Sequence, residues 1–130
     1  MRVPLFFLIC CAGLAGCGSP KTANLKGSLA LDGQPFALPA NAGEVFISFH
    51  GIGSDGKIDI FKKYGGTVSP SGSFEIIASA GELPVGTYQW SIDSAPGRVK
   101  EFEPFSYDKS KARVELKSGP NQIILDLNQR

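Results

Sequence analysis

The sequence predicts an all-β fold, a two-sheet sandwich of seven or eight strands. Apolar residues alternate with polar ones over short segments, and Gly and Pro separate those segments. No long window shows the i, i+3, i+4, i+7 spacing of an amphipathic helix. The chain has 130 residues, sixteen of them Gly and nine of them Pro, which is enough for one domain. Because each sheet has one apolar face, a second layer must cover it, and a sandwich results.

The N-terminal segment differs from the rest of the chain. A short basic start, residues 1–2, precedes a run of fourteen uncharged and mostly apolar residues at 3–16. This length is typical of the hydrophobic region of a cleaved signal peptide and is too short to span a bilayer comfortably as a helix. The run ends in Leu-Ala-Gly-Cys at 14–17, which resembles the lipobox of bacterial lipoproteins. The alternative is an ordinary secretory signal cut near the same place, with Cys17 as a spare thiol.

The lipobox resemblance implies that residues 1–16 are removed and that Cys17 becomes the lipid-modified N-terminus. Its sulfur would carry diacylglycerol and its new α-amine a further acyl chain such as palmitate. Two or three chains make a stable anchor, because each buried CH₂ contributes about 0.8 kcal/mol. Residue 18 is Gly rather than Asp, which by resemblance to lipoprotein sorting favours the outer membrane, facing the periplasm or the surface. We therefore expect an exported, lipid-anchored protein with a tether at 17–24 and a β-sandwich domain at 25–130.

Charge and cysteine content exclude several classes of function. Removal of residues 1–16 takes away Arg2 and no acid, so twelve basic and twelve acidic residues remain. A neutral domain has no electrostatic reason to bind nucleic acid, and the sequence has no polybasic patch for anionic lipids. Cys10 and Cys11 leave with the signal peptide and Cys17 takes the lipid. No thiol then remains for a disulfide, a metal site or catalysis.

The first three expected strands are 25–31, 44–50 and 57–64. The first has three leucines on one face and ends at an Asp-Gly pair, residues 32–33, which is typical of a tight hairpin turn. The second, after a loop with two prolines, alternates Val, Ile and Phe on its inward face. The third follows a turn at 51–56. Its register stays open, because Ile58 and Ile60 compete with Phe61 for the inward face.

The later strands are a short one at 67–68 and longer ones at 73–79, 87–93, 112–117 and 122–127. The glycine pair at 65–66 is expected to break the chain before them, and a turn at 69–72 leads into the strand at 73–79. The segment 87–93 has the clearest pattern, with Tyr, Trp and Ile alternating with polar residues. A long polar and aromatic loop, 94–111, separates it from the last two strands, which a turn at 118–121 joins.

Several turn and strand motifs occur in the order of a known family. They are GSLALDGQP at 27–35, VFISF at 45–49, GTVSPSGSF at 66–74 and LPVGTY at 83–88, with a last strand after GPN at 119–121. This series resembles the carboxypeptidase regulatory-like domains, which are transthyretin-like (prealbumin-like) sandwiches. The resemblance covers about 25–128 and implies a non-catalytic module. One departure is that Ser69 and Ser71 stand near the turn where the family often has Asp, which argues against an acidic role for this turn.

Two sets of polar residues are candidate sites, and each has a simpler interpretation. His50, the only histidine, has the chemistry of a general base or metal ligand. A zinc site needs several His or Cys ligands, so we expect a surface or turn histidine. Asp55 and Asp59 offer oxygens for Ca²⁺, but the segment lacks the EF-hand pattern and contains Lys57. A hairpin turn is the expected role of that segment.

Acidic and aromatic residues provide the remaining candidates. Glu101 and Glu103 resemble a glycosidase pair but lie in a charged loop, where solvated charges are expected. Trp90 with Tyr88 has the make-up of a sugar-stacking platform, although the alternation around them favours core packing. Three loop aromatics are expected either to cap the sandwich or to present a contact surface. They are Phe102, Phe105 and Tyr107.

The sequence therefore predicts a lipid-anchored, non-catalytic β-sandwich of the cell envelope with a structural or protein-interaction role. The alternatives are a carbohydrate-binding module of the envelope and an accessory protein of envelope transport or assembly. No catalytic, cofactor-binding or metal-binding residue is expected, and the one modified residue is Cys17. The expected partners are the membrane, through the lipid, and an envelope protein or glycan.

Overall fold

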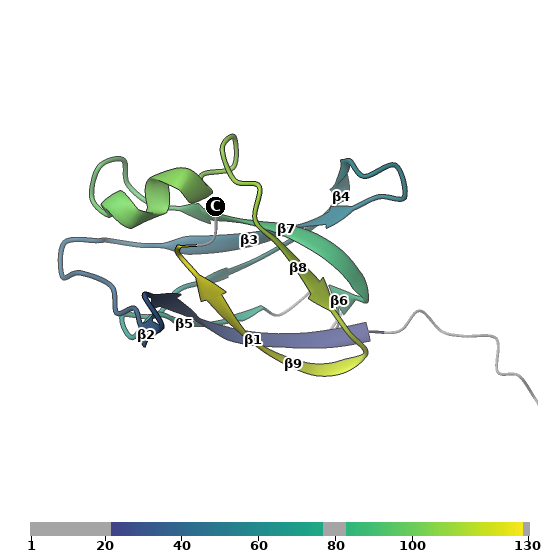
Figure 1. Cartoon of the computed structure of the whole chain (residues 1–130), viewed down its shortest axis with the longest axis horizontal. Helices are drawn as coiled ribbons and strands as arrows, with labels where there is room; N and C mark the ends of the chain where they lie inside the picture. Colours follow the sequence, from purple (N-terminus) through teal and green to yellow (C-terminus); the bar gives the residue numbers. More distant parts are fainter. Residues whose placement is uncertain (1–21, 77–82, 129–130) are drawn as a thin grey trace, which may run out of the picture.

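The computed structural model describes residues 22–76 and 83–128, so the expected signal peptide and Cys17 lie outside the described residues. Within the described ranges the chain forms two β-sheets, one above the other in Figure 1. The predicted all-β, two-sheet sandwich is thereby confirmed.

The first sheet is built around β1 and contains five strands. They are β1 (Thr22–Leu31), β2 (Gln34–Pro35), β5 (Ser73–Ile76), β6 (Leu83–Pro84) and β9 (Gly119–Asp126). β9 runs parallel to β1 along one side, and β6, β5 and β2 pair antiparallel with successive parts of its other side. The turn between β1 and β2 is the expected Asp32-Gly33 pair, with φ values of 52° and 76° that are typical of a two-residue hairpin.

The second sheet has four antiparallel strands in the order β4-β3-β7-β8. They are β3 (Phe46–Ile52), β4 (Ile58–Thr67), β7 (Gly86–Asp93) and β8 (Arg113–Leu116). The predicted alternation of β3 and β7 is confirmed, because their alternating apolar residues lie in the core between the sheets. These core residues are Ile47, Phe49, Tyr88, Trp90 and Ile92.

β1 begins earlier than the sequence predicted. The expected tether, 17–24, ends inside this strand, because Thr22 pairs with Pro84 of β6 and Ala23 with Gly119 of β9. The two short strands β2 and β6 were also not predicted. The described part of the chain therefore has nine strands rather than seven or eight.

β4 differs most from its predicted form. It continues through the glycine pair at 65–66 to Thr67, so the expected break there was wrong. Gly66 pairs with Ile47, and a Cβ on Gly66 would lie 2.6 Å from the carbonyl oxygen of Glu75. The absence of a side chain therefore lets β4 pass close to β5. In the part of β4 nearer its start, neither of the two faces considered for the inward side lies in the core, because Ile60 and Phe61 are both exposed.

The segment 94–111 contains a short 3-10 helix, η1 (Lys100–Phe105), where only a loop was expected. Phe102 and Phe105 are three residues apart, and the three-residue turn places them on one side of η1. Phe102 contacts Phe36 edge-on, and Phe105 stacks on Trp90 with ring centroids 4.7 Å apart. Both phenylalanines are buried, so they cap the sandwich rather than form an exposed contact surface.

Candidate functional site

A pocket lies on the outer face of the β4-β3-β7-β8 sheet. Strand alternation directs Ser48 and His50 of β3 away from the core, and directs Ser91 and Asp93 of β7 to the same side. The pocket encloses about 320 Å³, near the lower end of the roughly 300–1,000 Å³ found for small-molecule sites. Its lining residues are Ser48, His50, Ile58, Ile60, Lys63, Ser91, Asp93 and Tyr107.

The floor of this pocket, here called the His50 pocket, is polar. His50 is 5% exposed and Ser91 is 6% exposed. Ser48, which points to the same side, lies opposite Ser91 on the neighbouring strand. Among the described residues, the buried side-chain polar atom that has no hydrogen-bond partner is Trp90 Nε1, and the polar atoms of His50 and Ser91 are not in that position. His50, Ser48 and Ser91 line the pocket and offer hydrogen-bond donors and acceptors to a polar ligand.

The electrostatics of the pocket favour an uncharged ligand. Burial lowers the pKa of His50 below its ordinary value, and the positive charge of Lys63 lowers it further. The imidazole is therefore neutral near pH 7 and offers one donor and one acceptor nitrogen. Lys63 and Asp93 add one charge of each sign to the lining, so the pocket as a whole is balanced.

The walls of the pocket are apolar and come from two elements. Ile58 and Ile60 of β4 form one part, and Tyr107, which follows η1, forms another. The Tyr107 ring lies 4.9 Å from the His50 ring, centroid to centroid, at a tilt of 57°. Tyr107 remains 54% exposed, so its ring is available for a ligand to stack on.

Hydrogen bonds hold the segment that carries Tyr107 against the sheet. Gln89 donates from Nε2 to the carbonyl oxygen of Ser110 at 2.7 Å, and the Ser110 hydroxyl donates to the carbonyl oxygen of Trp90. The stack of Phe105 on Trp90 fixes the preceding turn. The aromatic wall of the pocket is therefore tied to the core rather than carried by a free loop.

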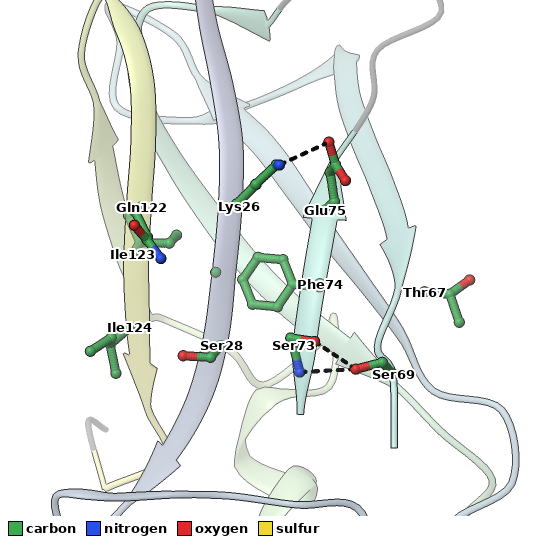
Figure 2. A pocket seen from close by; sticks show the side chains of 11 residues that line it. Lys26, Ser28, Thr67, Ser69, Ser73, Phe74, Glu75, Gln122, Ile123 and Ile124 are labelled. Atoms are coloured by element: carbon green, nitrogen blue, oxygen red, sulfur yellow. Dashed lines mark hydrogen bonds and ion pairs between the residues drawn. The ribbon is translucent and has the colours of Figure 1, made fainter. Parts of the chain in front are cut away.

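A second, larger hollow of about 770 Å³ lies on the outer face of the other sheet, over β1, β5 and β9 (Figure 2). Its polar side chains already interact with one another. Lys26 pairs with Glu75 at 3.9 Å, and the hydroxyls of Ser69 and Ser73 are 2.7 Å apart. The hydroxyl of Ser71 lies 2.9 Å from that of Ser69 and extends this network along the turn. Because its charged side chains are exposed and paired, this hollow is the weaker candidate.

The structure corrects the interpretation of His50. A surface or turn histidine was expected, but His50 lies within β3 and is buried. The alternation of β3 already placed Ser48 and His50 on one outward face, so a signal was present in the sequence. The approach of Tyr107, more than fifty positions along the chain, is what covers His50, and no local pattern predicts that contact.

The acidic candidates have local roles. Asp55 accepts a hydrogen bond from the backbone N–H of Lys57 at 3.1 Å, as a turn residue does. Asp59 accepts one from the N–H of Phe61 at 3.0 Å, within β4 rather than in the turn. Glu101 and Glu103 are exposed on η1, as expected of solvated charges. Among the described residues there is no group of three or more His, Cys, Asp or Glu side chains placed to hold a metal ion.

No protein-family model matches the chain, and neither does any curated protein or solved structure. Within residues 22–76 and 83–128, no helix is long and apolar enough to cross a membrane. The N-terminal segment and the His50 pocket are therefore the two features of the chain that bear on its function.

Proposed function

We propose that the protein is a lipid-anchored, non-catalytic module of the bacterial cell envelope that binds a glycan in the His50 pocket. The observation that carries this proposal is the pair of largely buried polar side chains, His50 and Ser91, that line the pocket together with an exposed tyrosine ring. A sugar ring has hydroxyls to satisfy such a floor and an apolar C–H face to stack on Tyr107. The structural or protein-interaction role predicted from the sequence has no comparable site behind it.

The same geometry supports a binding role rather than a catalytic one. A catalytic nucleophile and its base normally lie within hydrogen-bonding distance of each other. His50 lies opposite Gln89 on β7, whereas Ser91 lies opposite Ser48, so neither serine is the cross-strand partner of His50. The anchor is supported by the Leu-Ala-Gly-Cys motif at 14–17 and by the apolar run before it. Resemblance to carboxypeptidase regulatory-like domains agrees with a binding module.

Calorimetric titration of the full-length, lipidated protein in detergent with a panel of envelope-type oligosaccharides tests the glycan proposal. We expect at least one sugar to bind, and Tyr107→Ala and Ser91→Ala each to weaken it tenfold or more. Ser28→Ala is the matched control, because Ser28 lines the other hollow. If Ser28→Ala lost binding while Tyr107→Ala and Ser91→Ala kept it, the sugar site would lie in the hollow over the other sheet, which would contradict the proposal. A lack of any sugar binding, with a stoichiometric protein cross-linked in intact envelopes, would favour the protein-interaction or assembly role.

Fractionation of cells tests the anchor independently. Cys17→Ala should leave the protein without lipid and largely absent from the membrane fraction. The mass of the wild-type protein should exceed that of its polypeptide by the acyl groups. Full membrane retention of Cys17→Ala, together with an unmodified wild-type mass, would contradict the anchor.

A further inference from the structure

A large bulge interrupts β4 at the free edge of its sheet. β3 and β4 are paired at His50–Lys63 and again at Ile52–Ile58. Only Gly51 lies between these pairs on β3, whereas residues 59–62 lie between them on β4. The additional residues have no partners on β3, so this part of β4 must project from the strand. The hydrogen bond from the N–H of Phe61 to the carboxylate of Asp59, at 3.0 Å, shapes the projection.

The bulge presents the most exposed large apolar side chains in the described part of the chain. Phe61 is 91% exposed and Ile60 is 74% exposed, although they are adjacent in sequence. Lys57, Lys62 and Lys63 surround them and are exposed as well. An aromatic side chain at a projecting tip, with lysines beside it, is the combination that proteins use at the boundary between lipid headgroups and acyl chains.

Nearby acidic groups offset part of this positive charge. Asp55 and Asp59 lie in the same region, and each accepts a backbone hydrogen bond from a residue of the hairpin. Three lysines against two aspartates leave the region with an excess of one positive charge. The attraction of the tip for a bilayer would therefore depend mainly on Phe61, with the lysines reaching toward headgroup phosphates.

The bulge lies at the end of the molecule where the described chain begins. In Figure 1 the β3–β4 hairpin and the start of β1 are both at the right-hand end of the long axis. Cys17 is five positions before Thr22. Five residues span at most roughly 17 Å when fully extended. A lipid on Cys17 would therefore bring this end of the domain close to the bilayer.

We propose that the β4 bulge is a second membrane contact, in which Phe61 enters the lipid interface while the acyl chains on Cys17 hold the N-terminus. This inference rests on the proposed lipid anchor. One tether alone would let the domain rotate about it, whereas two separate contacts fix its orientation. Ile60 is part of the bulge and also lines the His50 pocket, so the same contact would hold that pocket beside the membrane surface.

The test uses the full-length, lipidated protein in vesicles of phosphatidylethanolamine and phosphatidylglycerol. Phe61→Cys receives a thiol-linked, polarity-sensitive fluorophore, and Ile124→Cys serves as the matched control. Ile124 is 72% exposed and lies on β9 of the other sheet. Both substitutions replace exposed side chains, so the fold should be kept, which circular dichroism can verify. Wild-type protein is treated with the same reagent, because a lipidated Cys17 leaves it no free thiol.

We expect the label at position 61 to shift to shorter wavelength on vesicles and to be quenched by lipids brominated on their acyl chains. The label at position 124 should do neither. The second contact would be overturned if the labels at the two positions gave identical spectra while the protein stayed bound to vesicles. If the wild type is also unlabelled in that experiment, the anchor remains intact. A blue shift at position 61 without bromine quenching would mean that protein covers the bulge, which also overturns the proposal. Labelling of the wild type at Cys17 would instead overturn the anchor, and the second contact with it.

Discussion

Replacing Gly72 by Ala tests how closely the turn between β4 and β5 packs on the connection that follows β2. Gly72 has a φ of +86°, and a Cβ there would overlap the carbonyl oxygen of Phe36. The turn is held in place by a hydrogen bond from the N–H of Leu29 to the carbonyl oxygen of Gly72 at 2.9 Å. The backbone around Gly72 therefore cannot move without breaking a contact with β1.

The expected cost has two parts. An L residue at this φ loses about 1–2 kcal/mol, and displacement of packed backbone adds about 1–3 kcal/mol. We therefore expect Gly72→Ala to lower the free energy of unfolding by roughly 2–5 kcal/mol. That is a large part of the roughly 5–15 kcal/mol by which a domain is typically stable.

Gly33→Ala is the control, because Gly33 has a similar φ of +76° but a Cβ added to it would meet no other atom within 4 Å. It should lose only the conformational part, about 1–2 kcal/mol. Urea unfolding followed by the fluorescence of Trp90, the single tryptophan, measures both variants. Equal losses in the two variants would refute the argument that the approach of Phe36 to the turn is what excludes a side chain at Gly72.

Two further predictions concern buried titratable groups. Because burial and Lys63 lower the pKa of His50, the unfolded chain binds its proton more readily than the folded one. The stability that neutral His50 contributes is thus complete above pH 6.5 and is lost as the pH falls through the pKa of His50 in the folded state. His50→Gln should therefore reduce the decline of the melting temperature on acidification. Burial and the neighbouring Tyr64 raise the pKa of Tyr88 to about 12. An ultraviolet titration should show one tyrosine ionising near that pH, and the free energy of unfolding should fall as the pH rises through the same value. Tyr88→Phe should abolish this ionisation step.

The strands of the core were predictable because the order of apolar and polar residues within each strand indicates which side chains are buried. In β3 and β7, the apolar residues that alternate with polar ones from Ile47 to Phe49 and from Tyr88 to Ile92 all lie in the core. A strand of period two has only two faces, so the pattern leaves one arrangement. The turn at Asp32-Gly33 was predictable for a similar reason, since two successive residues with positive φ restrict the choice of amino acid.

β4 was harder to predict because the order of apolar and polar residues along it does not indicate which side chains are buried. Its bulge exposes Ile60 and Phe61 together, so alternation along this segment does not separate buried from exposed side chains. The glycine pair at 65–66 has the composition of a break but the structural role of a close crossing, set by Glu75 on a different strand. Such a role depends on a partner that the local sequence does not contain.

Residues that are neighbours along the chain were enough to predict the sandwich and the inward faces of its core strands, because each of these depends on a local pattern. The lipid on Cys17 also follows from a local pattern and stays a prediction, since Cys17 lies outside the described residues. The His50 pocket, by contrast, exists only through tertiary packing. It joins an outward histidine of β3, a serine of β7, a bulge in β4 and Tyr107 after η1. Contacts between segments so far apart arise from how the sheet and its covering segment pack, and alternation within a single strand carries no information about them.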